Sequence, residues 1–326
     1  MSTMRAAVIR EAGAPEVLKI ETVPVPQPSA DQVLIRVRAF GLNRSELFTR
    51  RGLSPDVKFP RVLGIEAVGE VASAPGGQFD PGAVVATAMG GMGRQFDGGY
   101  AEYVCVPVNQ TQVLSTSLGW DVLGALPEML QTAWGSLFRA LRLKAGERLL
   151  VRGGTTSVGL AAAAIAKAHG ATVISTSRNP ARKVLLHDAG AREVVIDDGA
   201  IAGAVKELPG GGADKVLELI GATTLADSLQ CANEPGVVCM MGMVGDKWWI
   251  DKFSPMDVIP TGVCLTTYDG GSQDFMRTPL QELVEQVKAG GLRVQIGKVF
   301  HLDEIAEAHR CMEENKAGGK IVVLAS

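Results

Sequence analysis

Residues 149–160 read LLVRGGTTSVGL, and an alanine-rich run continues from there to His169. The apolar run stops at Gly153-Gly154, and the apolar residues that follow recur with helical spacing, so the pattern predicts a strand, a tight turn and a helix. Glycine lets the backbone turn sharply, and the free N–H groups and dipole of a new helix attract negative charge. A dinucleotide pyrophosphate fits such a turn. The residues expected to contact it are Gly153, Thr155, Thr156, Ser157 and Val158.

The segments that follow the glycine turn also alternate between strand-like and helix-length stretches. Strand-like runs cover residues 171–176, 194–197, 215–220 and 237–243. This order predicts a doubly wound parallel sheet, which binds dinucleotides beyond the carboxyl ends of its strands. The turn lacks a full G-x-G-x-x-G and, taken alone, is equally typical of a structural turn. Its place after the first strand of the pattern favours the cofactor interpretation.

The end of the second strand indicates which dinucleotide is bound. NAD-binding sheets carry an acidic residue there for the ribose hydroxyl, whereas this chain has Ser177 and Arg178 and no acid before Asp188. A hydroxyl and a guanidinium suit a 2′-phosphate, so we predict NADPH, with Arg182 and Lys183 as further contacts. The alternative is that these cations flank a solvated helix start.

Composition limits the possible partners. The chain has 326 residues, 46% of them hydrophobic, and a formal net charge of −3. The absence of a basic block argues against nucleic acid, and the absence of a long apolar run argues against a membrane span. We expect a cytoplasmic protein whose five scattered cysteines are mostly buried thiols.

The first 120 residues differ from the rest in their pattern of predicted secondary structure. Short β segments at residues 32–40, 61–71, 83–88 and 100–107 alternate with Gly and Pro turns, which is typical of a small β-barrel. Helical spacing covers 123–141, and the last elements return to the barrel. The expected organisation is a catalytic domain of residues 1–122 and 267–326, interrupted by a cofactor domain of residues 123–266.

These features together resemble the medium-chain dehydrogenase/reductase superfamily, and within it the zinc-free quinone oxidoreductase branch. The resemblance extends over essentially the whole chain and implies a GroES-like barrel plus a Rossmann domain. It also implies a homodimer formed through residues 262–268. The matching motifs are GLNRSE at 41–46, GIEAVGEV at 64–71, GGYAEY at 98–103, QTAW at 131–134, the glycine turn, and GGKIV at 318–322.

The resemblance also bears on metal chemistry. The zinc enzymes of the superfamily carry a Cys where this chain has Asn43 and a His where it has Ile65. Neither side chain is a comparable zinc ligand, and the four-cysteine structural lobe is missing too. We therefore expect no metal. The four histidines are interpreted as surface or packing residues.

Several site residues follow from the resemblance. Asn43 is the candidate hydrogen-bond donor to developing oxyanion charge, the alternative being a structural amide. Thr132 approaches the nicotinamide end, and Phe48 stands where many relatives have a Tyr lining the site, which leaves water as the proton source. Glu46 is either a polar tether or solvated, and Asp198 would oppose a 2′-phosphate if it pointed inward. The remaining groove residues are Ile220, Gly221, Gly242, Met243, Val244 and Asn315.

The predicted function is a metal-free, NADPH-dependent reductase that transfers hydride to quinones or other small, apolar, electron-poor acceptors. A reductase of enones or 2-enoyl thioesters remains an alternative, because it shares the hydride geometry. An NADPH-binding structural or regulatory protein with little turnover is an alternative of another class. The loop 89–96 and the segment 248–250 either cap the substrate site or pack elsewhere.

Overall fold

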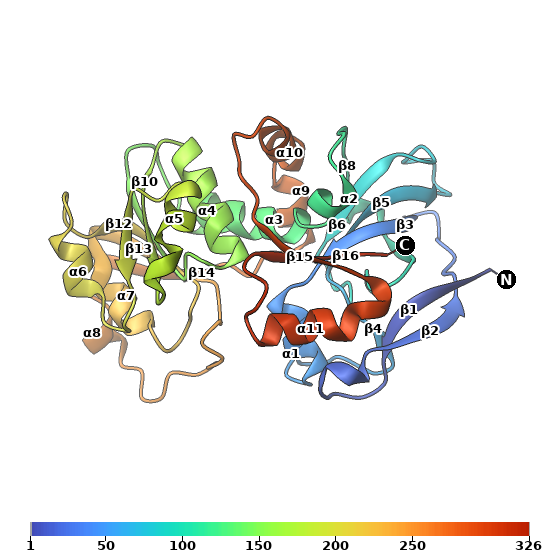
Figure 1. The fold of residues 1–326 in the computed structure, drawn as a ribbon, viewed down its shortest axis with the longest axis horizontal. Coiled ribbons are helices and arrows are strands. Elements are labelled where there is room, and N and C mark those ends of the chain that lie inside the picture. The colour runs from blue at the N-terminus through green and yellow to red at the C-terminus, as the bar shows by residue number, and fades with distance from the viewer. Residues whose placement is uncertain (1, 326) are drawn as a thin grey trace. The chain divides into compact units, whose positions relative to one another are not determined.

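The computed structural model describes residues 2–325, which form two compact units. The first unit contains the chain up to Gln131, together with Gly270–Lys288 and the residues from Val294 onward. The second contains Thr132–Asp269 and Ala289–Arg293. Figure 1 labels the elements of both units.

The first unit is a β-barrel built from segments at both ends of the chain. Its larger sheet has the order β15-β16-β3-β5-β6-β8, with β7 also paired to β3, and a smaller sheet has the order β2-β1-β4. Because β16 pairs with β3, C-terminal strands lie beside N-terminal ones (Figure 1). The strands are β1 (Thr3–Ile9), β2 (Lys19–Pro24), β3 (Gln32–Gly41), β4 (Arg61–Val62), β5 (Glu66–Ser73), β6 (Val84–Ala88), β7 (Tyr103–Pro107), β8 (Thr111–Val113), β15 (Ile296–His301) and β16 (Lys320–Leu324).

Helices connect and cover these strands. Helix α1 begins directly after β3, and α11 directly precedes the return of the chain to β16. Helix α3 crosses from the first unit into the second. The helices are α1 (Arg44–Arg50), α2 (Trp120–Leu123), α3 (Pro127–Gly135), α9 (Ser272–Arg277), α10 (Leu280–Lys288) and α11 (Ile305–Glu313).

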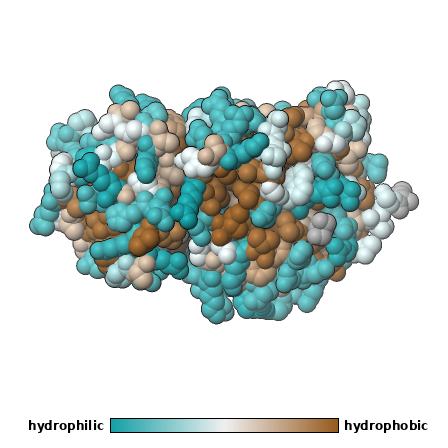
Figure 2. All heavy atoms as spheres, turned by 45° about the horizontal axis from the view of Figure 1, so that its top comes forward, coloured by the Kyte–Doolittle hydropathy of each residue, from teal (hydrophilic) through white to brown (hydrophobic). Residues whose placement is uncertain are grey.

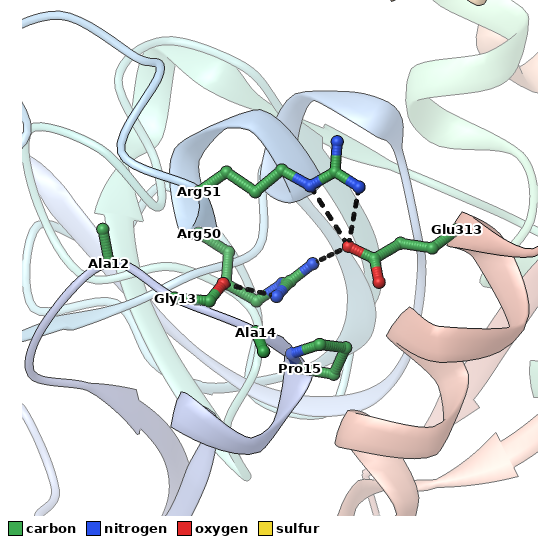
Figure 3. A pocket seen from close by; sticks show the side chains of 7 residues that line it. All are labelled: Ala12, Gly13, Ala14, Pro15, Arg50, Arg51 and Glu313. Carbon is green, nitrogen blue, oxygen red and sulfur yellow. Dashed lines mark hydrogen bonds and ion pairs between the residues drawn. The ribbon is translucent and has the colours of Figure 1, made fainter.

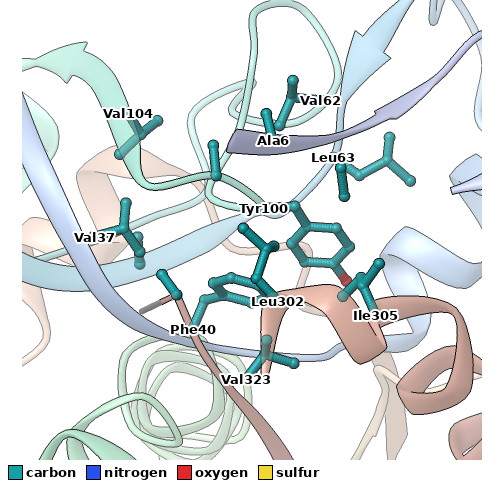
Figure 4. Close-up of a cluster of buried hydrophobic side chains, with 14 of the residues drawn as sticks. Ala6, Val37, Phe40, Val62, Leu63, Tyr100, Val104, Leu302, Ile305 and Val323 are labelled. Atoms are coloured by element: carbon teal, nitrogen blue, oxygen red, sulfur yellow. The ribbon is translucent and has the colours of Figure 1, made fainter. Parts of the chain in front are cut away.

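The barrel core gathers apolar side chains from distant parts of the sequence. Phe40 of β3 stacks on Tyr100 with ring centroids 4.7 Å apart. Leu302 and Ile305 reach the same cluster from the C-terminal segment, as Figure 4 shows. Burial of this apolar surface is the main force that holds the two ends of the chain together.

A buried polar chain runs from this core to the surface. The Tyr100 hydroxyl lies 3.1 Å from His309 Nε2, and Arg50 Nε donates to His309 Nδ1 at 3.3 Å. Burial and the Arg50 charge lower the pKa of His309 to about 3, so this histidine is a neutral packing residue, as predicted.

Arg50 also donates to Gly13 O and Glu313 at the wall of a surface pocket of about 420 Å³ (Figure 3). The residues that line this pocket are not those predicted for the site.

The second unit is a parallel sheet in the order β11-β10-β9-β12-β13-β14. Counted along the chain this is the order 3-2-1-4-5-6 of the doubly wound dinucleotide-binding fold, which confirms the predicted fold class. The strands are β9 (Arg148–Arg152), β10 (Thr172–Ser177), β11 (Glu193–Ile196), β12 (Ala213–Glu218), β13 (Ala232–Met240) and β14 (Val263–Thr267). The helices are α4 (Ser157–Ala168), α5 (Lys183–Asp188), α6 (Ala202–Glu207), α7 (Leu225–Cys231) and α8 (Pro255–Val258).

Two predicted elements are interrupted in the structure. The strand predicted at 61–71 splits into β4 and β5, because Gly64 adopts φ +103° and a side chain there would lie 2.8 Å from Gly99 N. The helical stretch predicted at 123–141 divides into the end of α2, α3 and a π-helical segment at Ser136–Ala140. Hydrophobic spacing continues through both interruptions, so spacing alone does not reveal them.

One face of the molecule shows how hydrophilic and hydrophobic residues are distributed over the surface (Figure 2). Hydrophilic side chains cover most of the margin of the face in Figure 2, and hydrophobic ones gather in smaller areas between them. Among residues 2–325, no helix is both long and apolar enough to cross a bilayer.

Candidate functional site

Asn43 stands at the junction between β3 and α1 in the barrel unit. Its backbone is extended, with φ −127° and ψ 153°, and helix α1 starts at the next residue. Glu46, three residues on, accepts the backbone N–H of Asn43 at 3.0 Å and that of Ile65 at 3.0 Å. The Glu46 N–H in turn donates to the backbone oxygen of Asn43 at 3.2 Å, so these bonds fix the Asn43 backbone at the start of the helix. The side chain of Asn43 is directed into a buried polar cluster.

That cluster contains Asn43, Glu46, Glu66, Glu128 and Lys320. Asn43 Nδ2 donates to Glu66 Oε1 at 2.9 Å, and Lys320 Nζ donates to Asn43 Oδ1. Lys320 Nζ also lies 3.0 Å from Glu66 Oε1 and 3.6 Å from Glu128 Oε2. Glu66 Oε2 accepts the backbone N–H of Glu128 at 2.9 Å. Each polar atom of the Asn43 amide therefore faces a partner of opposite hydrogen-bonding character.

The backbone of Gly41 makes room for the contact between Lys320 and Glu66. A Cβ at this position would lie 2.4 Å from Glu66 Oε1 and 2.4 Å from Lys320 Cε. Any larger residue would push the two charged groups apart. A glycine is required here for close approach rather than for an unusual backbone angle.

Burial shifts the proton affinities within the cluster. Burial lowers the pKa of Lys320, but the charges of Glu66 and Glu128 raise it by more, so this ammonium keeps its proton. Burial raises the pKa of Glu46 to about 7, opposed by the hydrogen bond from Ile65 N–H. Glu46 is 1% exposed, so the solvated role considered for it is wrong and the tether role is the observed one.

The other predicted catalytic residues are Phe48 and Thr132. Phe48 is buried on α1, one turn beyond Asn43, and Thr132 is buried in α3. Asn315, at the end of α11, has φ +53° and accepts a hydrogen bond from Arg44 at 2.7 Å. Asn43 thus directly precedes α1, and Arg44 and Phe48 lie on this helix.

The glycine turn of the second unit has the geometry expected of an anion cradle. Gly153 adopts φ +86°, and its N–H donates to Thr176 Oγ1 at 3.1 Å. Thr156 caps α4 by accepting the N–H of Gly159 at 3.0 Å. Within residues 2–325, no protein group accepts the N–H groups of Ser157 and Val158 at the start of α4. These two donors and the helix dipole can hold a negatively charged group.

Arg152 anchors the strand ends behind this turn. Its guanidinium is fully buried and contacts Asp197 at 2.9 Å and Asp227 at 2.6 Å. Burial lowers the pKa of Arg152, but the hydrogen bonds and charges of these carboxylates raise it by more. These contacts hold together three segments next to Gly153, namely the carboxyl ends of β9 and β11 and the start of α7.

Glu218 shapes the loop that follows β12. Its Oε1 accepts the N–H groups of Ile220 at 2.6 Å and Gly221 at 2.9 Å, and Oε2 accepts the Thr224 hydroxyl at 3.0 Å. Burial raises the pKa of Glu218. The chain after β13 packs closely on this loop. A Cβ at Gly242 would lie only 2.2 Å from Leu219 O, so this close approach requires a glycine. The predicted groove residues Ile220, Gly221, Gly242, Met243 and Val244 are brought together in this way.

The cationic residues predicted for the 2′-phosphate lie just beyond β10. Ser177 donates to Asn179 O and accepts from Asn179 N, both at 3.1 Å, which orders the turn. Arg178, Arg182 and Lys183 are exposed, and no ion pair involves them in the described part of the chain. Asp198 Oδ1 accepts the N–H of Ala200 at 3.1 Å, so its carboxylate is engaged in its own turn.

The side chains at the superfamily's zinc positions do not fit a zinc ion. The Asn43 carbonyl oxygen already accepts from the Lys320 ammonium, whose positive charge would oppose a second cation. Ile65 has no ligand atom. We therefore derive no step through a metal.

Comparisons with known proteins agree with this architecture. Residues 29–116 match the alcohol dehydrogenase GroES-like domain, and residues 189–323 match the family described as zinc-binding dehydrogenase. The human quinone oxidoreductase is 30% identical over 335 residues, covering 98% of each chain. A mycobacterial protein solved in complex with NADPH has a TM-score of 0.87 at 27% identity, covering 99% of this chain and 100% of its own. An NAD-dependent alcohol dehydrogenase has a TM-score of 0.89 at 29% identity, with 99% and 100% coverage.

The fold and the site together define a medium-chain dehydrogenase/reductase. Within that superfamily the chain belongs to the quinone oxidoreductase family, as the resemblance indicated, and it is an oxidoreductase.

The sequence did not lead us to assign roles to three buried charged side chains. Glu66, Lys320 and Arg152 lie within motifs that the sequence analysis used, yet only their neighbours were assigned roles. The signal was present, because each charged residue stands at the end of a strand directly beside a run of apolar residues, where a buried charge requires a partner.

Replacing Glu46 with Gln should change how stability depends on pH. The pKa of Glu46 is about 7 in the folded protein against an ordinary 4.5, so its contribution is complete below pH 4.5 and is lost as the pH rises through 7. Relative to Glu46→Gln, the wild type should lose about 3 kcal/mol of unfolding free energy between pH 4.5 and 8. Urea titrations of both proteins across this range provide the measurement. A constant difference would show that Glu46 does not titrate in this window.

Proposed function

We propose that this protein is an NADPH-dependent reductase that transfers hydride to quinones without a metal. The observation that carries the proposal is the start of α4, where the N–H groups of Ser157 and Val158 face no protein acceptor within residues 2–325. Arg178 and the absence of an acidic residue at the end of β10 favour a 2′-phosphate. The mycobacterial relative in complex with NADPH supports the same cofactor.

The residues of the second unit would hold the cofactor, and those of the barrel would act on the acceptor. Bound NADPH would supply the hydride, and a proton from solvent completes the two-electron reduction of a quinone to a hydroquinone. Gly153, Thr155, Thr156, Ser157 and Val158 would contact the pyrophosphate. The residues that would line the nicotinamide side are Ile220, Gly221, Gly242, Met243, Val244 and Thr132. Ser177, Arg178, Arg182 and Lys183 would contact the 2′-phosphate.

Asn43 would stabilise the negative charge that develops on the acceptor oxygen. One hydrogen of its Nδ2 is given to Glu66 at 2.9 Å, whereas the other has only a long contact of 3.4 Å to Glu46. The second hydrogen makes the weaker of the two hydrogen bonds, so it is the one for which an acceptor oxygen would compete with Glu46. Phe48 supplies an apolar wall and no proton.

The function is tested by following NADPH oxidation with a matched panel of acceptors. The panel pairs a benzoquinone and phenanthrenequinone with a simple enone and a crotonyl thioester. We expect turnover of the quinones. Turnover confined to the enone or thioester would replace quinone reduction with reduction of activated double bonds. Tight NADPH binding without turnover of any acceptor would indicate a binding protein.

Arg178→Ala tests the choice of cofactor. Loss of a charge-assisted contact to the 2′-phosphate should raise the KM for NADPH by roughly ten- to a hundredfold and leave the KM for NADH nearly unchanged. Steady-state kinetics with both cofactors measure the difference. Lys167→Ala, at the far end of α4, serves as a charge-matched control. Equal losses for NADPH and NADH would remove the 2′-phosphate assignment.

We also propose a homodimer formed through β14. This strand pairs with β13 and ends the sheet on that side, and Cys264 on it is exposed. An edge strand of this kind is satisfied by the same strand of a second copy. Light scattering should give twice the chain mass, and Cys264→Lys should shift the protein towards monomer while Cys264→Ser does not. A monomeric wild type would refute the dimer.

A further inference from the structure

The Asn43 amide has a single orientation that satisfies its surroundings. Its carbonyl oxygen receives the ammonium of Lys320, and its nitrogen donates to Glu66 Oε1 at 2.9 Å. Rotating the amide by half a turn would set two donors face to face at Lys320 and two acceptors face to face at Glu66. The pair of charges thus determines which way the amide hydrogens point.

The same pair polarises the amide. Lys320 is 2% exposed and Glu66 is fully buried, so water does not screen their fields. The Lys320 ammonium beside the carbonyl oxygen draws electron density away from the amide nitrogen. This strengthens the N–H groups of the amide as hydrogen-bond donors. One of these hydrogens is taken by Glu66, and the other has only the 3.4 Å contact to Glu46.

We propose that Lys320 and Glu66 are positioning residues for hydride transfer, which orient and polarise the Asn43 amide so that its second hydrogen meets the oxygen of the acceptor. The inference rests on the proposed function, because it requires Asn43 to contact the acceptor. It goes beyond that function in assigning the strength of the donor to two buried residues on β16 and β5.

The central experiment separates orientation from stability with a double variant. Lys320→Met alone leaves the Glu66 carboxylate buried without its cation, so this variant loses both stability and activity. In Lys320→Met/Glu66→Gln both charges of the Lys320–Glu66 pair are gone, while Glu46 and Glu128 keep their carboxyl groups. The carboxamide oxygen introduced by Glu66→Gln can accept from Glu128 N–H, and its nitrogen can donate to Asn43 Oδ1 once the Asn43 amide has turned round. The double variant therefore favours the reversed Asn43 amide and avoids the unpaired buried carboxylate that Lys320→Met leaves.

We expect the double variant to regain a Tm close to that of the wild type while its kcat stays about ten- to a hundredfold lower. The Kd for NADPH, measured by fluorescence, should be unchanged, because these residues lie in the barrel unit. Recovery of kcat together with Tm would overturn the inference and reduce the pair to a structural role.

Two further variants complete the test. In an Asn43→Ala background the double substitution should cause no additional loss of kcat, since the residue through which it acts is gone. An undiminished further loss would overturn the inference. Arg38→Met breaks the half-buried pair of Arg38 with Glu70, 2.7 Å apart on β3 and β5, and should lower Tm without lowering kcat.

The failure of the proposed function is distinguishable from the failure of this inference. Asn43→Ala with the kcat of the wild type would remove Asn43 as the donor and with it the site assignment. A slow Asn43→Ala variant beside a fast double variant would remove only the positioning role of Lys320 and Glu66.

Discussion

The ammonium of Lys320 is buried among carboxylates, and the barrel unit is arranged around it. Lys320 is at the start of β16, Glu66 at the start of β5, Glu128 in α3, and Asn43 at the start of α1. An isolated charge in this position would be strongly unfavourable, so the cluster exists only when all four segments are in place. Segments distant in sequence are therefore held to one geometry at the residue that is the candidate donor.

The second unit uses buried charge in a comparable way. Arg152 joins Asp197 and Asp227 beneath the glycine turn, and Glu218 holds the N–H groups of the loop after β12. Arg152 and Glu218 each stand at the end of a strand. Their side chains bond to backbone atoms of the loop after β12 and so fix its conformation. At the start of α4, Thr156 adds a further fixed contact by accepting the N–H of Gly159.

The same contacts engage the side chain that stands at a zinc-ligand position of the superfamily's zinc enzymes. In place of a Lewis acid, the barrel carries an amide whose oxygen is held by an ammonium. An amide of this kind can stabilise negative charge by hydrogen bonding. Glu46, with its pKa near 7, holds the backbone on the other side of Asn43 and adds a group that titrates in the physiological range.

The sequence by itself determined the class of fold, because the periodicity of its apolar residues and the glycine turn after residues 149–152 are local properties. It also determined the family, through ordered motifs along the chain, and it named Asn43 and the start of α4. Only the tertiary structure decided the partners of those residues. Lys320 and Asn43 are separated by 277 positions, and Arg152 and Asp227 by 75. Such pairings depend on the register of strands and on the burial of charge, which emerge only when the chain is folded.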